Sequence, residues 1–156
     1  MTGRAELDRQ KQRLNDTFKR ASGLKSDPEL LSDFARHLCV LVSGFLEQAI
    51  IELLLEYIRV RSSKEIVRHV EQRLRRFTSP NANNLIALLG SFDLGWQKDL
   101  ESYLVDEHKD AVDSVVNLRH TISHGRDAGV TMASVQRYYD RVKEVVDHIA
   151  DLCIPT

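Results

Sequence analysis

The feature that most constrains the fold is an apolar run that begins after Asp27-Pro28 and meets no strong breaker until Ser62-Ser63. Asp27 can cap a helix and Pro28 fits its first position, so we predict one helix of about thirty residues, on the order of 45 Å long. Apolar side chains cover more than half of its circumference, which is typical of a helix in the middle of a bundle. Its thin polar stripe consists of Gly44, Gln48, Glu52 and Glu56.

The composition fits one all-helical domain. The 156 residues include only three prolines and seven glycines, and 42% of them are hydrophobic. No stretch alternates with the period of a strand, and no internal repeat is visible. We therefore predict a single domain over residues 1–156, an all-α, up-and-down bundle of four main helices with short accessory helices and an N-terminal edge helix within residues 1–25.

Capping residues and apolar spacing predict the remaining helices. A capping box, Ser62-x-x-Glu65, opens a third helix that reaches about Phe77 and carries one apolar stripe, with its arginines mostly away from that stripe. Thr131 can cap the last helix, on whose inner face we place Tyr138. The stripe of the third helix is Ile66, Val67, Val70 and Leu74. The other predicted elements are helices 4–23, 82–89, 97–104 and 106–124, with a linker at 91–96 that carries the only tryptophan.

The cysteine content and the N-terminal sequence indicate a reducing compartment. Two cysteines, Cys39 and Cys153, do not make a disulfide framework in a domain of this size. The first residues lack the apolar segment of a signal peptide, and the long apolar run carries acids such as Glu47 and Glu52. We expect a cytoplasmic protein that makes no use of a membrane.

Charge is unevenly distributed, although the net charge is only -1. Residues 59–76 hold seven basic and two acidic residues, a local charge of +5, whereas residues 93–156 hold twelve acids and seven bases. A molecule with this charge distribution can attract the phosphate backbone of a nucleic acid to its basic side. For any one of these charges, a solvated helix face with ordinary ion pairs is the more common explanation.

Residues 118–127 concentrate the reactive side chains at the predicted end of a helix. Arg119 and His124 are separated by four residues, His120 follows the arginine, Ser123 adds a hydroxyl, and Gly125 closes the helix. An arginine can bind a phosphate while a histidine takes the proton of a ribose 2′-hydroxyl, which suffices to cleave RNA without a metal.

Two other interpretations of this segment remain open. His120 and His124 have the H-x3-H spacing of zinc ligands, but no glutamate lies between them as in H-E-x-x-H, and no cysteine is near in the sequence. In the third interpretation the polar groups only cap the helix and bind its last carbonyls.

The segment resembles the R-x4–6-H motif of the HEPN superfamily, and the order of features over residues 25–150 is similar to RiboL-PSP-type HEPN proteins. Three stretches carry the likeness: Ser43-Gly44-Phe45-Leu46-Glu47 in the long helix, the residues from Arg73 to Phe92, and a last helix with Tyr138, Tyr139, Arg141 and Val142. The resemblance implies a helical bundle that dimerises so that two motifs face one cleft. Nucleases of this kind cut RNA without metal or other cofactor.

The resemblance also implies roles for individual residues. Arg119 and His124 would be the catalytic pair, with His120 and Ser123 in support and Glu47 orienting the arginine. We expect RNA to contact the basic residues Arg68, Arg73, Arg75, Arg76 and Arg126. Many such nucleases are toxins or effectors in antiviral defence or toxin–antitoxin systems, which implies a homodimer with an antitoxin or a regulatory protein as partner. The alternatives are a non-catalytic HEPN module that binds RNA or a protein, and an accessory subunit.

Overall fold

The protein folds into a bundle of helices, described here by a computed structural model for residues 3–23, 27–125 and 129–155. Seven helices and no strand occur among these residues, which confirms the predicted all-α class. The helices are α1 (Gly3–Ser22), α2 (Pro28–Arg59), α3 (Lys64–Leu74), α4 (Ala82–Gly90), α5 (Leu94–Tyr103), α6 (Asp106–Ser123) and α7 (Met132–Cys153).

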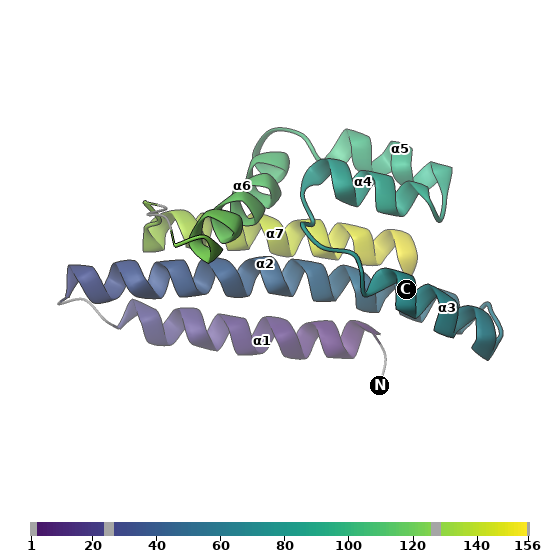
Figure 1. The fold of residues 1–156 in the computed structure, drawn as a ribbon, viewed down its shortest axis with the longest axis horizontal. Helices are drawn as coiled ribbons and strands as arrows, with labels where there is room; N and C mark the ends of the chain where they lie inside the picture. The colour runs from purple at the N-terminus through teal and green to yellow at the C-terminus, as the bar shows by residue number, and fades with distance from the viewer. Residues whose placement is uncertain (1–2, 24–26, 126–128, 156) are drawn as a thin grey trace.

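The helix α2 is the centre of the bundle, as its apolar sequence predicts. It begins where expected, because the Asp27 carboxylate accepts hydrogen bonds from the backbone N–H groups of Glu29 and Leu30. By length and composition α2 could cross a membrane, but 67% of its most apolar stretch of 18 residues is buried inside the fold. Such burial is typical of the core helix of a bundle, which packs here against α1, α6 and α7 (Figure 1).

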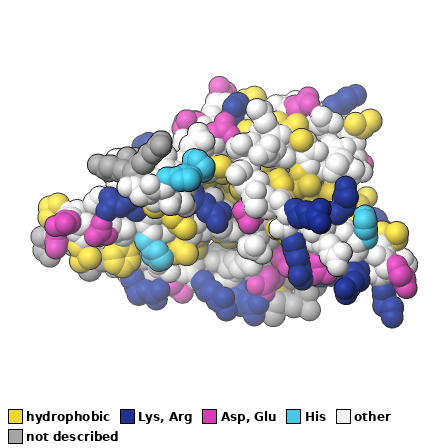
Figure 2. Space-filling view, viewed as in Figure 1, with side chains coloured by type: hydrophobic (Ala, Val, Ile, Leu, Met, Phe, Trp, Pro, Cys, Tyr) yellow, Lys and Arg dark blue, Asp and Glu magenta, His cyan; other side chains and the backbone are white. Residues whose placement is uncertain are grey.

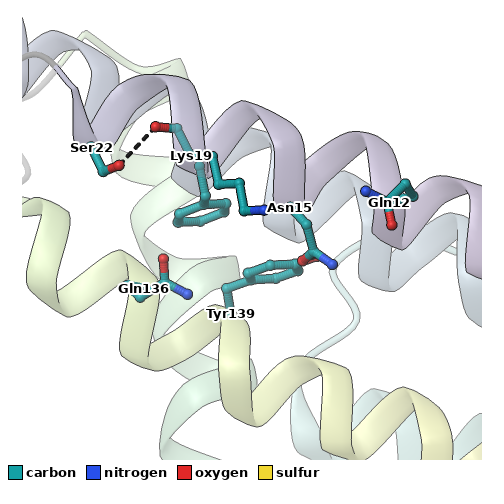
Figure 3. A pocket seen from close by; sticks show the side chains of 7 residues that line it. Gln12, Asn15, Lys19, Ser22, Gln136 and Tyr139 are labelled. Carbon is teal, nitrogen blue, oxygen red and sulfur yellow. Dashed lines mark hydrogen bonds between the residues drawn. The ribbon is translucent and has the colours of Figure 1, made fainter.

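The helices α1 and α7 lie beside α2, with α1 running in the opposite direction to the other two (Figure 1). The Phe18 and Tyr139 rings stack with centroids 4.7 Å apart, and the Tyr139 hydroxyl donates to Asn15 Oδ1 at 2.7 Å (Figure 3). At the other end of α1, Arg4 donates to the Ile154 carbonyl at 2.8 Å. Tyr138 is partly buried and packs against the core, as predicted, but the fully buried ring of this face is that of Tyr139, which the prediction left out.

The helix α6 crosses the long helices at a steep angle, and α4 and α5 cover the end of the bundle (Figure 1). The predicted linker at 91–96 is wrong, because Asp93 caps α5 by accepting from the Trp96 N–H at 3.0 Å. Trp96 therefore belongs to the first turn of α5. Its ring packs edge-on against Tyr57 of α2, with centroids 4.7 Å apart.

The helix α3 projects from the end of α2 and is the least buried element of the fold (Figure 1). The predicted capping box at Ser62 and Glu65 is wrong: Ser63 is the N-cap, with its Oγ accepting from the Ile66 N–H. The predicted apolar stripe of this helix is only partly covered, since Leu74 is buried, Val67 and Val70 are half-buried, and Ile66 is 52% exposed. The charged residues of α3 and part of its apolar face are therefore exposed to solvent.

Both cysteines are free thiols in the core. Burial raises the pKa of Cys39 to about 11 and that of Cys153 to about 12, because a thiolate loses its hydration in an apolar interior. Neither residue has the exposed, low-pKa environment that makes a cysteine reactive.

Candidate functional site

The contact between α2 and α6 brings together the two charged residues that the sequence analysis paired. Arg119 Nη1 lies 3.4 Å from Glu47 Oε2, and the Glu47 side chain is only 17% exposed. A carboxylate with so little solvent exposure is stabilised by a nearby guanidinium. The ion pair in turn limits the conformations of the arginine side chain. Glu47 thus holds Arg119 in a defined position on the surface of α6.

A cavity of about 170 Å³ lies against this ion pair. Its walls come from α2, from α6 and from the segment that connects α3 to α4, and they combine hydroxyl groups, a carboxylate, a guanidinium and an imidazole. The lining residues are Ser43, Glu47, Thr78, Ser79, Val116, Arg119, His120 and Ser123. Four of the residues predicted from the sequence therefore meet here: Glu47, Arg119, His120 and Ser123.

Three hydroxyl-bearing residues of the cavity, Ser43, Thr78 and Ser79, were not predicted. Ser43 is completely buried, and its Oγ has no hydrogen-bond partner among the described residues. A buried hydroxyl that faces a cavity in this state is free to bind a polar ligand or water. The sequence carried one signal for it, since Ser43 stands four residues before Glu47 and so shares its helix face.

The two histidines of the motif lie at the C-terminal end of α6. The backbone N–H of His124 donates to the backbone carbonyl of His120 at 3.2 Å. Gly125 adopts a φ of +72°, the left-handed conformation that ends a helix. The imidazole centroids are 4.4 Å apart with the rings nearly perpendicular. Both histidines are exposed; His120 lines the cavity, whereas His124 lies next to His120 and does not line it.

A comparison with protein-family models identifies the architecture. The model described as RiboL-PSP-HEPN matches residues 5–154, nearly the whole chain. The chain belongs to the RiboL-PSP-HEPN family. The family resemblance inferred from the motif is thereby confirmed. Searches of the curated proteins and of the solved structures find no match.

A second hollow of the HEPN fold also borders Arg119. It is an open, mainly apolar groove of about 500 Å³ between α1 and α2. Arg119 therefore stands between a polar cavity and an apolar groove. The groove residues are Gln10, Arg13, Leu14, Thr17, Val40, Leu41, Gly44, Phe45, Gln48 and Arg119.

The basic residues that the sequence analysis assigned to RNA fall into two groups in this HEPN domain. Arg68, Arg73 and Arg76 are exposed on or just after α3, and no ion pair involves them within the described part of the chain. Arg75 is instead paired with Glu71 at 2.9 Å. Arg126 lies outside the described residues.

The charged and histidine-bearing regions of the domain share one face. Figure 2 shows histidine side chains over the end of α6 and, farther along the same face, Lys and Arg side chains around α3. Among the described residues, no three His, Cys, Asp or Glu side chains form a group that could hold a metal ion. The arrangement can bind a phosphate with fixed cations and offers imidazoles for proton transfer.

Proposed function

We propose that this HEPN protein is a metal-independent endoribonuclease, with Arg119 and His124 as its catalytic pair. The observation that carries the proposal is the Arg119–Glu47 ion pair on the wall of a hydroxyl-lined cavity, beside two imidazoles whose centroids are 4.4 Å apart. A fixed guanidinium can stabilise charge on a phosphate, and an adjacent imidazole can accept or donate a proton, and phosphodiester transfer requires both.

The reaction follows from what RNA itself supplies. An imidazole removes the proton of the ribose 2′-hydroxyl, and the 2′-oxygen forms a bond to the adjacent phosphorus. The bond from phosphorus to the 5′-oxygen breaks, and that oxygen takes up a proton, which leaves a 2′,3′-cyclic phosphate and a 5′-hydroxyl. Arg119 stabilises the negative charge that develops on the phosphate oxygens. The second imidazole is close enough to the first to supply the proton of the leaving group.

The active form in this proposal is a homodimer. The groove of about 500 Å³ that borders Arg119 supports it, because the groove is mainly apolar and includes the partly exposed Leu41 and the glycine Gly44. A second copy packed there would bring its own motif toward the first. His124, which lies outside the cavity of its own subunit, would then act in a cleft built by both subunits.

The cellular role belongs to the same proposal and rests on the family resemblance. We infer a cytoplasmic toxin or effector in antiviral defence or in a toxin–antitoxin system, controlled by an antitoxin or another regulatory protein. Arg68, Arg73, Arg75, Arg76 and Arg126 would contact the RNA substrate.

Cleavage of RNA in excess EDTA tests the activity. We expect the wild type to cut, leaving 2′,3′-cyclic phosphate ends. His124→Ala should lose about 100- to 10,000-fold in rate, the range for a general acid or base. Arg119→Ala should lose about 100- to 1,000-fold, the range for a group that stabilises charge in the transition state. His120→Ala run in parallel assigns the second imidazole. His37→Ala is a matched control, since His37 is exposed on α2 and has no hydrogen-bond partner among the described residues.

One observation favours a second candidate function, a non-catalytic module that binds RNA or a partner protein. The exposed His124 does not line the cavity that holds Arg119 in the single chain. Failure of the folded wild-type dimer to cut a varied set of RNAs would establish this alternative. Arg119 would then hold a ligand without contributing to chemistry.

A further inference from the structure

An apolar cleft of about 450 Å³ lies between α3 and α4, away from the cavity at Arg119. The aromatic rings of Phe77 and Phe92 line it together with Leu88 and Val70, and all four are partly exposed. Two arginines, Arg73 and Arg76, also line it, as do Leu74 and Ser91. Figure 2 shows the corresponding pattern, hydrophobic side chains bordered by Lys and Arg side chains where α3 meets α4.

The two arginines are free to bind an anion. Neither Arg73 nor Arg76 makes an ion pair with any described residue, and both are exposed. The neighbouring Arg75 differs, because it does not line the cleft and is paired with Glu71. Two of the three unpaired arginines on or just after α3 therefore stand at the apolar cleft, and the third, Arg68, lies outside it. This arrangement favours a ligand with a flat apolar group next to an anionic one.

An unstacked nucleotide has this combination. Proteins that hold single-stranded RNA stack its bases on aromatic rings and bind the backbone phosphates with arginine or lysine. The cleft volume falls within the range of small-ligand pockets, about 300 to 1,000 Å³. We propose that the α3–α4 cleft binds one base of single-stranded RNA against Phe77 and Phe92, with Arg73 and Arg76 on the flanking phosphates.

The cleft lies next to the Arg119 cavity, so a base bound in the cleft would influence where the RNA is cut. Phe77 lines the cleft, and the next two residues, Thr78 and Ser79, line the Arg119 cavity. Consecutive Cα atoms are about 3.8 Å apart, so the two sites adjoin. The connecting segment is also fixed to α6, because the Ala82 N–H donates to Asp113 Oδ1 at 2.9 Å.

This inference rests on the proposed function, since it takes RNA as the substrate and adds that the substrate is single-stranded. A base held in the cleft belongs to a near neighbour of the nucleotide at Arg119. The cleft then selects which base stands close to the cut, while Arg119 and the histidines act on the backbone without regard to sequence.

Binding measurements on the whole 156-residue chain test the site without requiring cleavage. The probe is a fluorescent single-stranded RNA bound to the His124→Ala protein at several salt concentrations. Phe77→Leu and Phe92→Leu should weaken binding about 5- to 150-fold, the effect of losing one stacked base, with an unchanged salt dependence. Arg73→Ala combined with Arg76→Ala should lower the slope of log K against log salt by about 1.4, or roughly 0.7 per lost phosphate contact.

A second pair of charges serves as the control. Lys64→Ala combined with Lys98→Ala removes the same charge from exposed positions outside the cleft and should leave the slope unchanged. The arginine variants change only exposed side chains, so they remain informative if a phenylalanine variant unfolds. Normal affinity in both folded phenylalanine variants, or an equal loss of slope in the lysine control, would overturn the proposal.

Cross-linking separates this inference from the activity. RNA that contains 5-bromouridine should cross-link under ultraviolet light to Phe77 or Phe92, as mapped by mass spectrometry. A cross-link in the cleft without cleavage by the wild type would overturn the nuclease and keep the base site. Cleavage by the wild type with cross-links only outside the cleft would overturn the base site and keep the nuclease.

Discussion

Arg119 Nη1 lies 3.4 Å from Glu47 Oε2 across the contact between α6 and α2, although 72 residues separate them in the sequence. Each residue occupies a regular helix, so the distance is set by how the two helices pack. The glutamate is less exposed than the arginine, at 17% against 39%. Glu47 is therefore the anchor of the pair, and Arg119 is the member that reaches solvent and a ligand.

Glu47→Gln tests this relationship. The substitution keeps the size of the side chain and a hydrogen-bond acceptor but removes the charge, so Arg119 is held less firmly. If the protein cuts RNA, we expect the cleavage rate to fall by roughly tenfold, since a hydrogen bond to a charged group contributes roughly 1 kcal/mol more than a neutral one. Stability should change by less than about 1 kcal/mol, as is usual for partly exposed pairs.

Glu52→Gln is the matched control for this variant. Glu52 lies one and a half turns along the same helix and faces Arg59 at 3.9 Å, a pair that borders neither the cavity nor the groove. Its cleavage rate should equal that of the wild type. Equal rates for Glu47→Gln and the wild type would show that Arg119 needs no anchor.

The groove beside Arg119 yields a prediction about assembly. Leu41 is 36% exposed in the single chain and lines the groove, so a glutamate there would place a charge in an apolar dimer interface. We expect Leu41→Glu to shift the protein from dimer to monomer in sedimentation equilibrium and to abolish cleavage. The monomer itself should stay folded, because the position is already partly exposed.

Leu30→Glu controls for the added charge. Leu30 is 41% exposed on the first turn of the same helix and does not line the groove. Its variant should remain dimeric and active. A Leu41→Glu protein that is still fully dimeric would exclude this groove as the interface.

The sequence predicted the elements of the fold better than their ends. The apolar circumference of α2 and the cap at Asp27 are local properties, and both predictions are confirmed. The N-cap of α3 was wrong by one residue, because Ser62 and Ser63 are equally good caps by residue type. Tyr138 and Tyr139 both lie near the apolar face of α7, and the choice between them depends on Asn15 of α1.

Residue spacing predicted the candidate site only where it is local in sequence, and Glu47, on another helix, was assigned through the family resemblance. Arg119, His120 and Ser123 lie within two turns of one helix, and the motif that contains them carried the family resemblance. The Ser43 hydroxyl and the Thr78–Ser79 segment reach the same cavity from α2 and from the α3–α4 connection. Their approach depends on helix packing, which residue spacing does not encode. The cleft at Phe77 and Phe92 was missed for the same reason.

Gly125 gives a prediction about the end of α6. Its φ of +72° is unfavourable for any residue with a Cβ, and among the described residues beyond its chain neighbours nothing crowds the place where a Cβ would be. Gly125→Ala should therefore lower the free energy of unfolding by roughly 1 to 2 kcal/mol through backbone strain alone. Gly125→Asn should cost less, because asparagine tolerates this conformation better. Denaturant unfolding measures both.

Gly23→Ala provides the comparison. Gly23 also follows the end of a helix, but it does not have a positive φ, and an added Cβ would meet the Arg20 carbonyl at an ordinary 3.5 Å. This variant should be as stable as the wild type or slightly more stable. Equal losses in Gly23→Ala and Gly125→Ala would mean that the left-handed conformation is not the cause.

Contacts of His108 and Arg141 with the Glu144 carboxylate make the stability of the fold depend on pH. His108 Nε2 lies 2.7 Å from Glu144 Oε2, and Arg141 Nη1 donates to Glu144 Oε1 at 2.9 Å. These hydrogen bonds, that of His108 first, hold the pKa of Glu144 below its ordinary value. The interaction links α7 to α6, and Tyr103 of α5 stacks on His108 at 4.5 Å.

A carboxyl group whose pKa is lowered by folding stabilises the native state above its unfolded pKa, about 4.3 for glutamate. This contribution is lost as the pH falls through the lower, native pKa. We therefore expect Glu144→Gln to lower the Tm near neutral pH and to make no difference once the wild-type carboxyl is protonated. Because Glu144 is 46% exposed, the effect at neutral pH should be small but measurable by thermal unfolding.

Glu101→Gln is the appropriate control for this pH dependence. Glu101 is exposed on α5 and has no ion pair among the described residues, so its removal should leave the Tm curve against pH parallel to that of the wild type. For Glu144→Gln, the two curves should instead converge toward acid pH. Parallel curves for Glu144→Gln would mean that His108 and Arg141 do not act on this carboxyl, and the acid dependence would have to come from other carboxylates.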